Sequence, residues 1–161
     1  MRRGLFLDRD GVINIDHGYV CSIEDFHFVE GVLDTIRKAQ IGGYIPIVVT
    51  NQSGIGRGYY GADEFEELSA YMIEKMREAG IDIDREHIFY CPHTPDEGCR
   101  CRKPGPAMLL EAIERFDIDP ALSVMVGDKQ SDIEAGRSAG IGRLLLVEKN
   151  KKFELEDIDG F

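Results

Sequence analysis

The sequence predicts an α/β fold: a doubly wound, Rossmann-like parallel sheet in three α/β/α layers. Apolar runs too short for a helix recur along the chain, and segments with apolar residues at helical spacing lie between them. Such alternation is typical of parallel sheets. In these sheets, ligands bind beyond the carboxyl ends of the strands, where this chain places Asp8, Thr50 and Asp128.

The size and charge of the chain limit its function. Its 161 residues fit one domain over residues 1–161 without a separate cap domain. The net charge of −11 disfavours nucleic acid as a partner. No apolar run approaches membrane-spanning length, and no signal-peptide core follows the N-terminus. We therefore expect a cytoplasmic monomer that binds neither nucleic acid nor membrane, with cysteines that are free or metal-bound.

The first expected strand, residues 4–7, ends in two carboxylates. Asp8 and Asp10 stand one residue apart, and Gly11 then lets the backbone turn. Close carboxylates repel each other, which favours a shared proton or a bound cation, although a charged surface loop is an alternative. The irregular connection over residues 14–30 is long, and long loops in compact domains are often functional.

The remaining elements follow from periodicity and from glycine or proline boundaries. The three glycines and Arg57 of segment 51–58 favour anion binding by backbone amides, with a flexible surface loop as the alternative. The tail over residues 149–161 alternates charges, and we expect it to fray. Helices are expected over residues 31–42, 63–79 and 104–116 and in a small-residue segment that ends at Gly140, and strands over residues 44–50, 88–90, 122–126 and 144–147.

Three thiols and one imidazole lie within eleven residues. Cys91, His93, Cys99 and Cys101 match the Cys₃His class of zinc sites. A disulfide is the alternative, but it leaves His93 without a role and suits a cytoplasmic chain poorly. Because the protein supplies all four ligands, we expect a structural zinc ion that pins the loop over residues 91–101.

Four motifs in order resemble those of haloacid dehalogenase superfamily phosphatases. More narrowly, Asp16-x-Gly18-Tyr19, the segment 50–58 and the cysteine–histidine loop resemble the zinc-loop branch, which acts on heptose bisphosphate or histidinol phosphate. The resemblance covers nearly the whole chain to about residue 147. The four motifs are Asp8-Arg9-Asp10-Gly11-Val12, Val49-Thr50-Asn51, Arg102-Lys103-Pro104 and Gly127-Asp128-x-x-x-Asp132.

This resemblance implies a magnesium-dependent phosphatase that works through an aspartyl phosphate. Asp8 is the implied nucleophile, and Asp10 the acid and base. Thr50 and Lys103 are expected to stabilise the phosphoryl oxygens, while Asp132 orients Lys103 or the metal shell. Magnesium is expected on Asp8, Asp128 and the carbonyl of Asp10.

The implied substrate is a small phosphosugar. The Asp16–Tyr19 stretch favours removal of the 7-phosphate of a heptose 1,7-bisphosphate, in nucleotide-activated heptose and lipopolysaccharide biosynthesis, with Arg57 or Arg102 holding the distal phosphate. Histidinol phosphate is the alternative substrate. A zinc-stabilised phosphosugar-binding or regulatory protein is the alternative of another class, although no catalytic residue is missing. The expected substrate contacts are Arg9, Asp16, Gly18, Tyr19, Asn51, Gln52, Ser53, Arg57, Arg102 and Lys129.

Overall fold

A five-stranded, all-parallel sheet forms the centre of the protein. The computed structural model describes residues 1–158 of the 161. The strand order is β3-β2-β1-β4-β5, and every neighbouring pair is parallel. The strands are β1 (Arg3–Leu7), β2 (Tyr44–Asn51), β3 (Ile88–Cys91), β4 (Val124–Gly127) and β5 (Arg143–Leu146).

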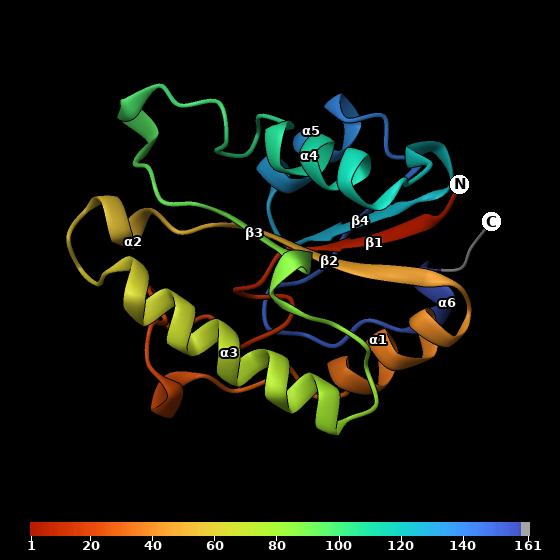
Figure 1. The fold of residues 1–161 in the computed structure, drawn as a ribbon, viewed down its shortest axis with the longest axis horizontal. Coiled ribbons are helices and arrows are strands. Elements are labelled where there is room, and N and C mark those ends of the chain that lie inside the picture. The colour runs from red at the N-terminus through yellow and green to blue at the C-terminus, as the bar shows by residue number, and fades with distance from the viewer. Residues whose placement is uncertain (159–161) are drawn as a thin grey trace.

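Helices cover both faces of this sheet (Figure 1). Side chains alternate along β1, so that Leu5 and Leu7 join the core beneath α1 and α3 while Phe6 joins the core beneath α4 and α5. The predicted three-layer α/β/α class is therefore confirmed. The α-helices are α1 (Val32–Ile41), α2 (Ser53–Gly56), α3 (Ala62–Glu78), α4 (Ala107–Phe116), α5 (Gln130–Ser138) and α6 (Leu155–Ile158); 3₁₀ turns span Ile23–Asp25, Arg85–His87, Pro95–Glu97 and Pro120–Leu122.

The strand register brings the polar strand ends to one edge of the sheet. Leu7 pairs with Val48 of β2 and with Val126 of β4. Asp8, Thr50 and Asp128 therefore all lie at the carboxyl edge, although more than forty residues separate each from the next in the sequence.

Two sequence expectations about local structure are wrong. Segment 53–56 forms the helical turn α2, and the amides of residues 55–58 donate to protein carbonyls, among them Gly56 N to Pro92 O at 2.9 Å. The expectation of anion binding is therefore wrong for the amides of residues 55–58. The helix expected from residue 104 begins instead at Ala107, with Pro106 as its N-cap.

The expectation of a frayed tail is also wrong for residues 149–158. Phe153 and Ile158 are buried in the core shared with α1 and α3. The charged residues around Phe153 and Ile158 mask any apolar periodicity, so their burial could not be predicted from the sequence. Residues 159–161 of the expected tail lie outside the described residues. Through residue 158, no helix is both long and apolar enough to cross a bilayer.

Candidate active site

A buried lysine lies at the centre of the carboxyl edge. Lys103 Nζ donates to Asp8 Oδ1 at 2.9 Å, to Asp132 Oδ1 at 2.6 Å and to the carbonyl of Val49 at 2.8 Å. Burial opposes the charge on Lys103, but the two carboxylates outweigh it and raise the pKa of the ammonium. Lys103 is therefore a fixed cation with an acceptor for each of its three protons.

Asn51 holds the backbone of Lys103 in place. Its side-chain Oδ1 accepts from Lys103 N at 3.0 Å, and its Nδ2 donates to Lys103 O at 3.2 Å. These two bonds connect the end of β2 to the segment before α4. Asn51 lines the neighbouring cavity, but its amide also positions the lysine.

Three carboxylates surround this single lysine. Oxygens of Asp8, Asp128 and Asp132 lie within 4.8 Å of one another. Burial raises the pKa of Asp8 despite the opposing effect of Lys103, and burial likewise raises the pKa of Asp128, with Asp132 acting in the same direction. The cluster therefore lacks positive charge when all three carboxylates are ionised.

A divalent cation fits this deficit. Asp128 Oδ1 is buried and has no hydrogen-bond partner, so the protein leaves a free acceptor beside Asp8. Both oxygens of Asp132 are already used, by Lys103 Nζ and by the amide of Lys129 at 3.1 Å. Oxygen ligands suit Mg²⁺. Asp8 and Asp128 therefore have the geometry to hold the ion, and Asp132 orients the lysine.

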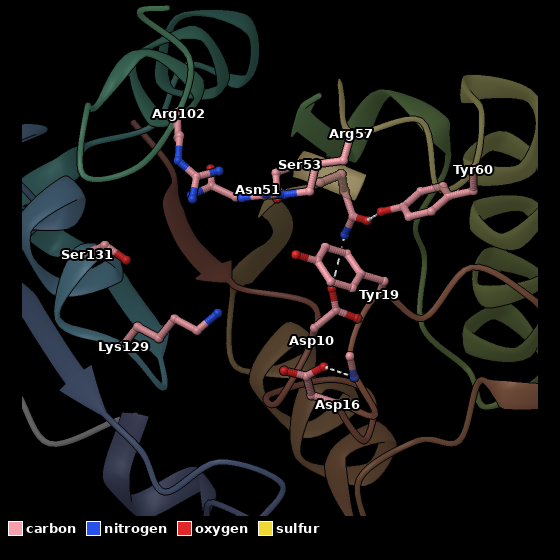
Figure 2. Close-up of a pocket in the computed structure, with 12 residues that line it drawn as sticks. Asp10, Asp16, Tyr19, Asn51, Ser53, Arg57, Tyr60, Arg102, Lys129 and Ser131 are labelled. Atoms are coloured by element: carbon pink, nitrogen blue, oxygen red, sulfur yellow. Dashed lines mark hydrogen bonds between the residues drawn. The ribbon is translucent and has the colours of Figure 1, made fainter. Parts of the chain in front are cut away.

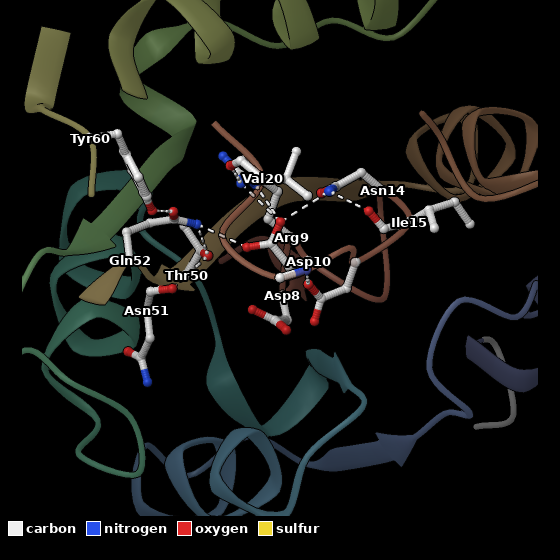
Figure 3. A network of polar contacts seen from close by, with 12 residues as sticks. Asp8, Arg9, Asp10, Asn14, Ile15, Val20, Thr50, Asn51, Gln52 and Tyr60 are labelled. Carbon is white, nitrogen blue, oxygen red and sulfur yellow. Dashed lines mark hydrogen bonds and ion pairs between the residues drawn. The ribbon is translucent and has the colours of Figure 1, made fainter. Parts of the chain in front are cut away.

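The carboxylate of Asp10 is held by four donor contacts (Figure 3). Oδ1 accepts from Arg9 Nη2 at 2.8 Å, from Arg9 Nε at 3.2 Å and from Asn14 Nδ2 at 3.0 Å. Oδ2 accepts from Gln52 Nε2 at 3.1 Å. The carboxylate of Asp10 still lines the cavity, so it is oriented by the protein and accessible to a ligand.

Tyr60 fixes the orientation of the Gln52 amide. Its hydroxyl donates to Gln52 Oε1, which turns Gln52 Nε2 toward Asp10 and toward Thr50 Oγ1 at 2.9 Å. Burial raises the pKa of Tyr60 to about 12, so the phenol keeps the proton it donates. The relay from Tyr60 through Gln52 to Asp10 was not predicted from sequence, because an isolated tyrosine carries no motif.

A cavity of about 330 Å³ opens above this cluster (Figure 2). Nine of the ten residues expected to contact substrate line it, together with Asp10, Tyr60 and Ser131. In Figure 2, Lys129 and Ser131 form the wall opposite Tyr60, while Arg57 and Arg102 lie along the upper rim. The cavity is thus polar, with cations on separate walls and carboxylates at its floor.

Arg9 is the exception, and its expected substrate contact is corrected. The side chain is only 2% exposed and donates to Asp10 and to the carbonyl of Val20 at 2.8 Å. Its guanidinium also lies 5.8 Å from the ring centre of Phe26. The contacts with Val20 and Phe26 hold the guanidinium inside the protein, where it binds Asp10 and not the substrate.

Comparison with known proteins agrees with this geometry. Residues 100–157 match the family model described as HAD-hydrolase-like. The chain is 45% identical over 157 residues to D-glycero-beta-D-manno-heptose-1,7-bisphosphate 7-phosphatase of Pasteurella multocida, covering 94% of this chain and 84% of the relative. It is 48% identical to D-glycero-alpha-D-manno-heptose-1,7-bisphosphate 7-phosphatase of Campylobacter jejuni, covering 93% and 85%.

The chain belongs to the haloacid dehalogenase-like phosphatases. A solved structure of D,D-heptose 1,7-bisphosphate phosphatase from B. bronchiseptica, complexed with magnesium and phosphate, superimposes with a TM-score of 0.82 at 35% identity. The alignment covers 89% of this chain and 79% of that one. The sequence-based assignment to this superfamily is therefore confirmed.

The cysteine–histidine loop of this phosphatase differs in one respect from expectation. The structure joins Cys91 and Cys101 by a disulfide, whereas the sequence analysis expected none. Yet His93 Nδ1 lies 3.4 Å from Cys91 Sγ and 3.3 Å from Cys101 Sγ, and Cys99 Sγ lies 3.5 Å from Cys91 Sγ. All four predicted zinc ligands thus lie within 4.8 Å of one another, a cluster that a two-cysteine disulfide does not require.

Proposed function

We propose that this phosphatase removes the 7-phosphate of D-glycero-D-manno-heptose 1,7-bisphosphate. The observation that carries the proposal is the position of Asp8, which accepts from the Lys103 ammonium and lies within 4.8 Å of Asp128, a carboxylate whose Oδ1 has no hydrogen-bond partner. Relatives across more than 90% of the chain carry this activity in their names. The small polar cavity suits a phosphosugar.

Asp8 is the proposed nucleophile. Its carboxylate oxygen attacks phosphorus, the bond from phosphorus to the sugar oxygen breaks, and an aspartyl phosphate forms. Mg²⁺ held by Asp8, Asp128 and the Asp10 carbonyl would neutralise charge on the phosphoryl group. All three Lys103 protons already have acceptors, so the lysine would reach a phosphoryl oxygen by sharing the proton that it now donates to Asp8.

Asp10 is the proposed acid and base. It gives a proton to the departing sugar oxygen, and it takes a proton from the water that hydrolyses the aspartyl phosphate. The donors from Arg9, Asn14 and Gln52 hold the carboxylate in one orientation through both steps. Thr50 Oγ1, held by Gln52, is the proposed neutral donor to the phosphoryl group.

The remaining cavity residues are proposed to hold the rest of the substrate. Arg57 and Arg102 form a cationic rim suited to the distal phosphate, and Lys129 is a third cation on another wall. Asp16, Asn51 and Ser53 offer acceptors and donors for sugar hydroxyls. This division implies that affinity for the sugar and chemistry at phosphorus depend on different residues.

We also propose a structural zinc ion on Cys91, His93, Cys99 and Cys101. Donor atoms of a tetrahedral zinc site lie about 3.5–3.8 Å apart, close to the separations of His93 and Cys99 from their neighbours. Arg102 directly follows this loop, and its Nη1 donates to the carbonyl of His93 at 3.4 Å, so zinc would fix one wall of the cavity.

Elemental analysis tests the zinc site. Protein purified with reductant is expected to contain one zinc ion per chain, and Cys99→Ser to lose it. A Cys91–Cys101 disulfide does not need Cys99. In protein denatured without reductant, this disulfide leaves Cys21 and Cys99 as the titratable thiols. Zinc-free protein in which Cys99→Ser lowers the thiol count from two to one would therefore favour the disulfide.

A substrate panel tests the activity. With Mg²⁺, we expect kcat/KM for one anomer of heptose 1,7-bisphosphate to exceed that for histidinol phosphate by about 100-fold. Phosphorus NMR is expected to show the 1-phosphate retained. Preference for histidinol phosphate would instead indicate a histidinol-phosphate phosphatase. Absence of turnover on every substrate would favour a phosphosugar-binding or regulatory protein. The cytoplasmic location, single-domain extent and monomeric state stay predictions.

A further inference from the structure

The tail that follows β5 returns to the active site. Asn150 N donates to the carbonyl of Gly11 at 2.9 Å, one residue after Asp10. Further along, the carbonyl of Phe153 accepts from Thr35 Oγ1 of α1 at 3.1 Å, and the Phe153 side chain is buried. The tail is therefore attached on one side to the turn over residues 8–11, here called the catalytic turn, and on the other side to the core.

The same tail residue also holds the loop that lines the substrate cavity. Asn150 Oδ1 accepts from the amide of Asp16 at 2.8 Å. Asn150 has a positive φ of 64°, a conformation that asparagine tolerates better than most residues. In this conformation its backbone amide bonds Gly11 and its side chain bonds Asp16, so one residue links the catalytic turn to the substrate loop.

Lys149 acts on the carboxylate of the same loop residue. Its Nζ lies 3.3 Å from Asp16 Oδ2, while Asp16 Oδ1 accepts from the amide of Gly18 at 2.8 Å. Burial alone would raise the pKa of Asp16, but the Gly18 amide and Lys149 outweigh it and lower the pKa. Asp16 is thus held by the tail at its backbone and at its side chain.

We propose that Asn150, assisted by Lys149, is a positioning residue for substrate binding. It sets how far the Asp16–Tyr19 loop stands from the catalytic turn, and so where Asp16 meets the sugar. The kinetic test of this inference rests on the proposed function, because it uses the proposed substrate. Asn150 contacts neither Asp8 nor Lys103, so its loss weakens sugar binding more than it slows chemistry at phosphorus.

Two substitutions at position 150 distinguish the role of the Asn150 side chain from the role of its backbone conformation. Asn150→Gly keeps the positive φ available and removes the acceptor, whereas Asn150→Asp keeps an acceptor oxygen. Lys151→Ala, at the next, exposed position, is the matched control. For heptose 1,7-bisphosphate, we expect Asn150→Gly to raise KM about tenfold with kcat within about threefold, and Asn150→Asp to stay near the parent enzyme.

Two further measurements distinguish the inference from the proposed function. The kcat/KM loss of Asn150→Gly should be at least about fivefold larger for the bisphosphate than for p-nitrophenyl phosphate, which has no sugar. Hydrogen exchange without substrate should be faster in the peptide containing Asp16. Equal losses on both esters, or unchanged exchange at Asp16, would overturn the positioning role. Failure of the parent enzyme on the bisphosphate would overturn the proposed function alone, because the exchange measurement needs no substrate.

Discussion

Lys103 donates to Asp132 Oδ1 at 2.6 Å, a shorter contact than its 2.9 Å bond to Asp8. The side chains of Lys103 and Asp132 are each only 2% exposed, so water does not screen the pair. In the proposed mechanism, Asp132 is therefore the anchor that would hold the ammonium while Asp8 changes from carboxylate to acyl phosphate. A lysine held only by Asp8 would lose its partner when the nucleophile reacts.

Asp132→Asn tests this anchor. Asp132 uses both oxygens as acceptors, for Lys103 Nζ and for the amide of Lys129. An amide has one oxygen, so its NH₂ group must face one of these donors. We expect kcat to fall at least about tenfold, with a stability loss of about 1–3 kcal/mol. Asp63→Asn, on the exposed first turn of α3, is the control. Unchanged kcat in Asp132→Asn would contradict the anchoring role.

Removal of Mg²⁺ should make stability strongly pH-dependent. Burial, with Asp132 and Asp10, raises the pKa of Asp8 to about 8. A raised carboxyl pKa contributes stability that is present below the unfolded value and is lost as pH rises through the folded value. The metal-free protein is therefore expected to lose about 5 °C in Tm between pH 5 and pH 9.

Magnesium should reverse this loss, and more so at higher pH. Protons compete with the ion for the carboxylates, so the Tm gain from Mg²⁺ is expected to be larger at pH 8 than at pH 5.5. Asp8→Asn removes the titrating nucleophile. It should abolish turnover, flatten the metal-free profile and raise Tm at pH 8. A metal-free Tm that rises across this range in the parent enzyme would refute the charge deficit at the site.

Much of the reacting centre could be predicted from the sequence, because the strand ends determine it. Each apolar run specifies a buried strand, and parallel strands bring their carboxyl ends together wherever the chain reverses through a helix. Asp8, Thr50 and Asp128 are therefore brought together by rules that act over short segments. Lys103 lies between β3 and α4, and its place in the site was expected only from the motif resemblance.

The supporting contacts could not be predicted, because they depend on how distant segments pack. The bond from Asn150 to Asp16 joins residues 134 positions apart and requires the tail to be held by Phe153. The inward direction of Arg9 depends on Val20 and Phe26 in the following loop. Motifs name the residues that react but carry little information on those that hold them.

Tyr60→Phe should slow the reaction although the Tyr60 hydroxyl is not among the groups proposed to contact the phosphoryl oxygens. The variant loses the donor to Gln52 Oε1, so the amide is free to rotate away from Asp10. We expect kcat to fall about three- to tenfold, with a smaller change in KM. Tyr59→Phe, on the exposed neighbouring ring, is the control. Equal effects of the two substitutions would argue against the relay.

Arg57→Ala tests the cationic rim. Arg57 lines the cavity without contacting Asp8 or Asp10, and its Nε reaches only Ser53 Oγ at 3.5 Å among the hydrogen bonds of the described side chains. Its guanidinium is thus available to a distal phosphate. KM for a bisphosphate is expected to rise at least about tenfold, and KM for the matching monophosphate by less than about twofold. Equal increases for both substrates would remove Arg57 from the distal site.

Gly11→Ala should weaken Mg²⁺ binding because of where a methyl group would lie. Gly11 has a φ of +91°, and a Cβ there would stand 2.5 Å from Asp128 Oδ2. The methyl group must therefore displace the carboxylate proposed to hold the ion. Gly140→Ala is the control. Gly140 has a φ of +83°, so the backbone strain is similar, but an added Cβ would lie 4.0 Å from its nearest neighbour, Pro120 Cβ. In a thermal-shift titration, Gly11→Ala is expected to need at least about tenfold more Mg²⁺ than Gly140→Ala. Similar titration midpoints for both variants would show that the ion does not depend on the position of Asp128.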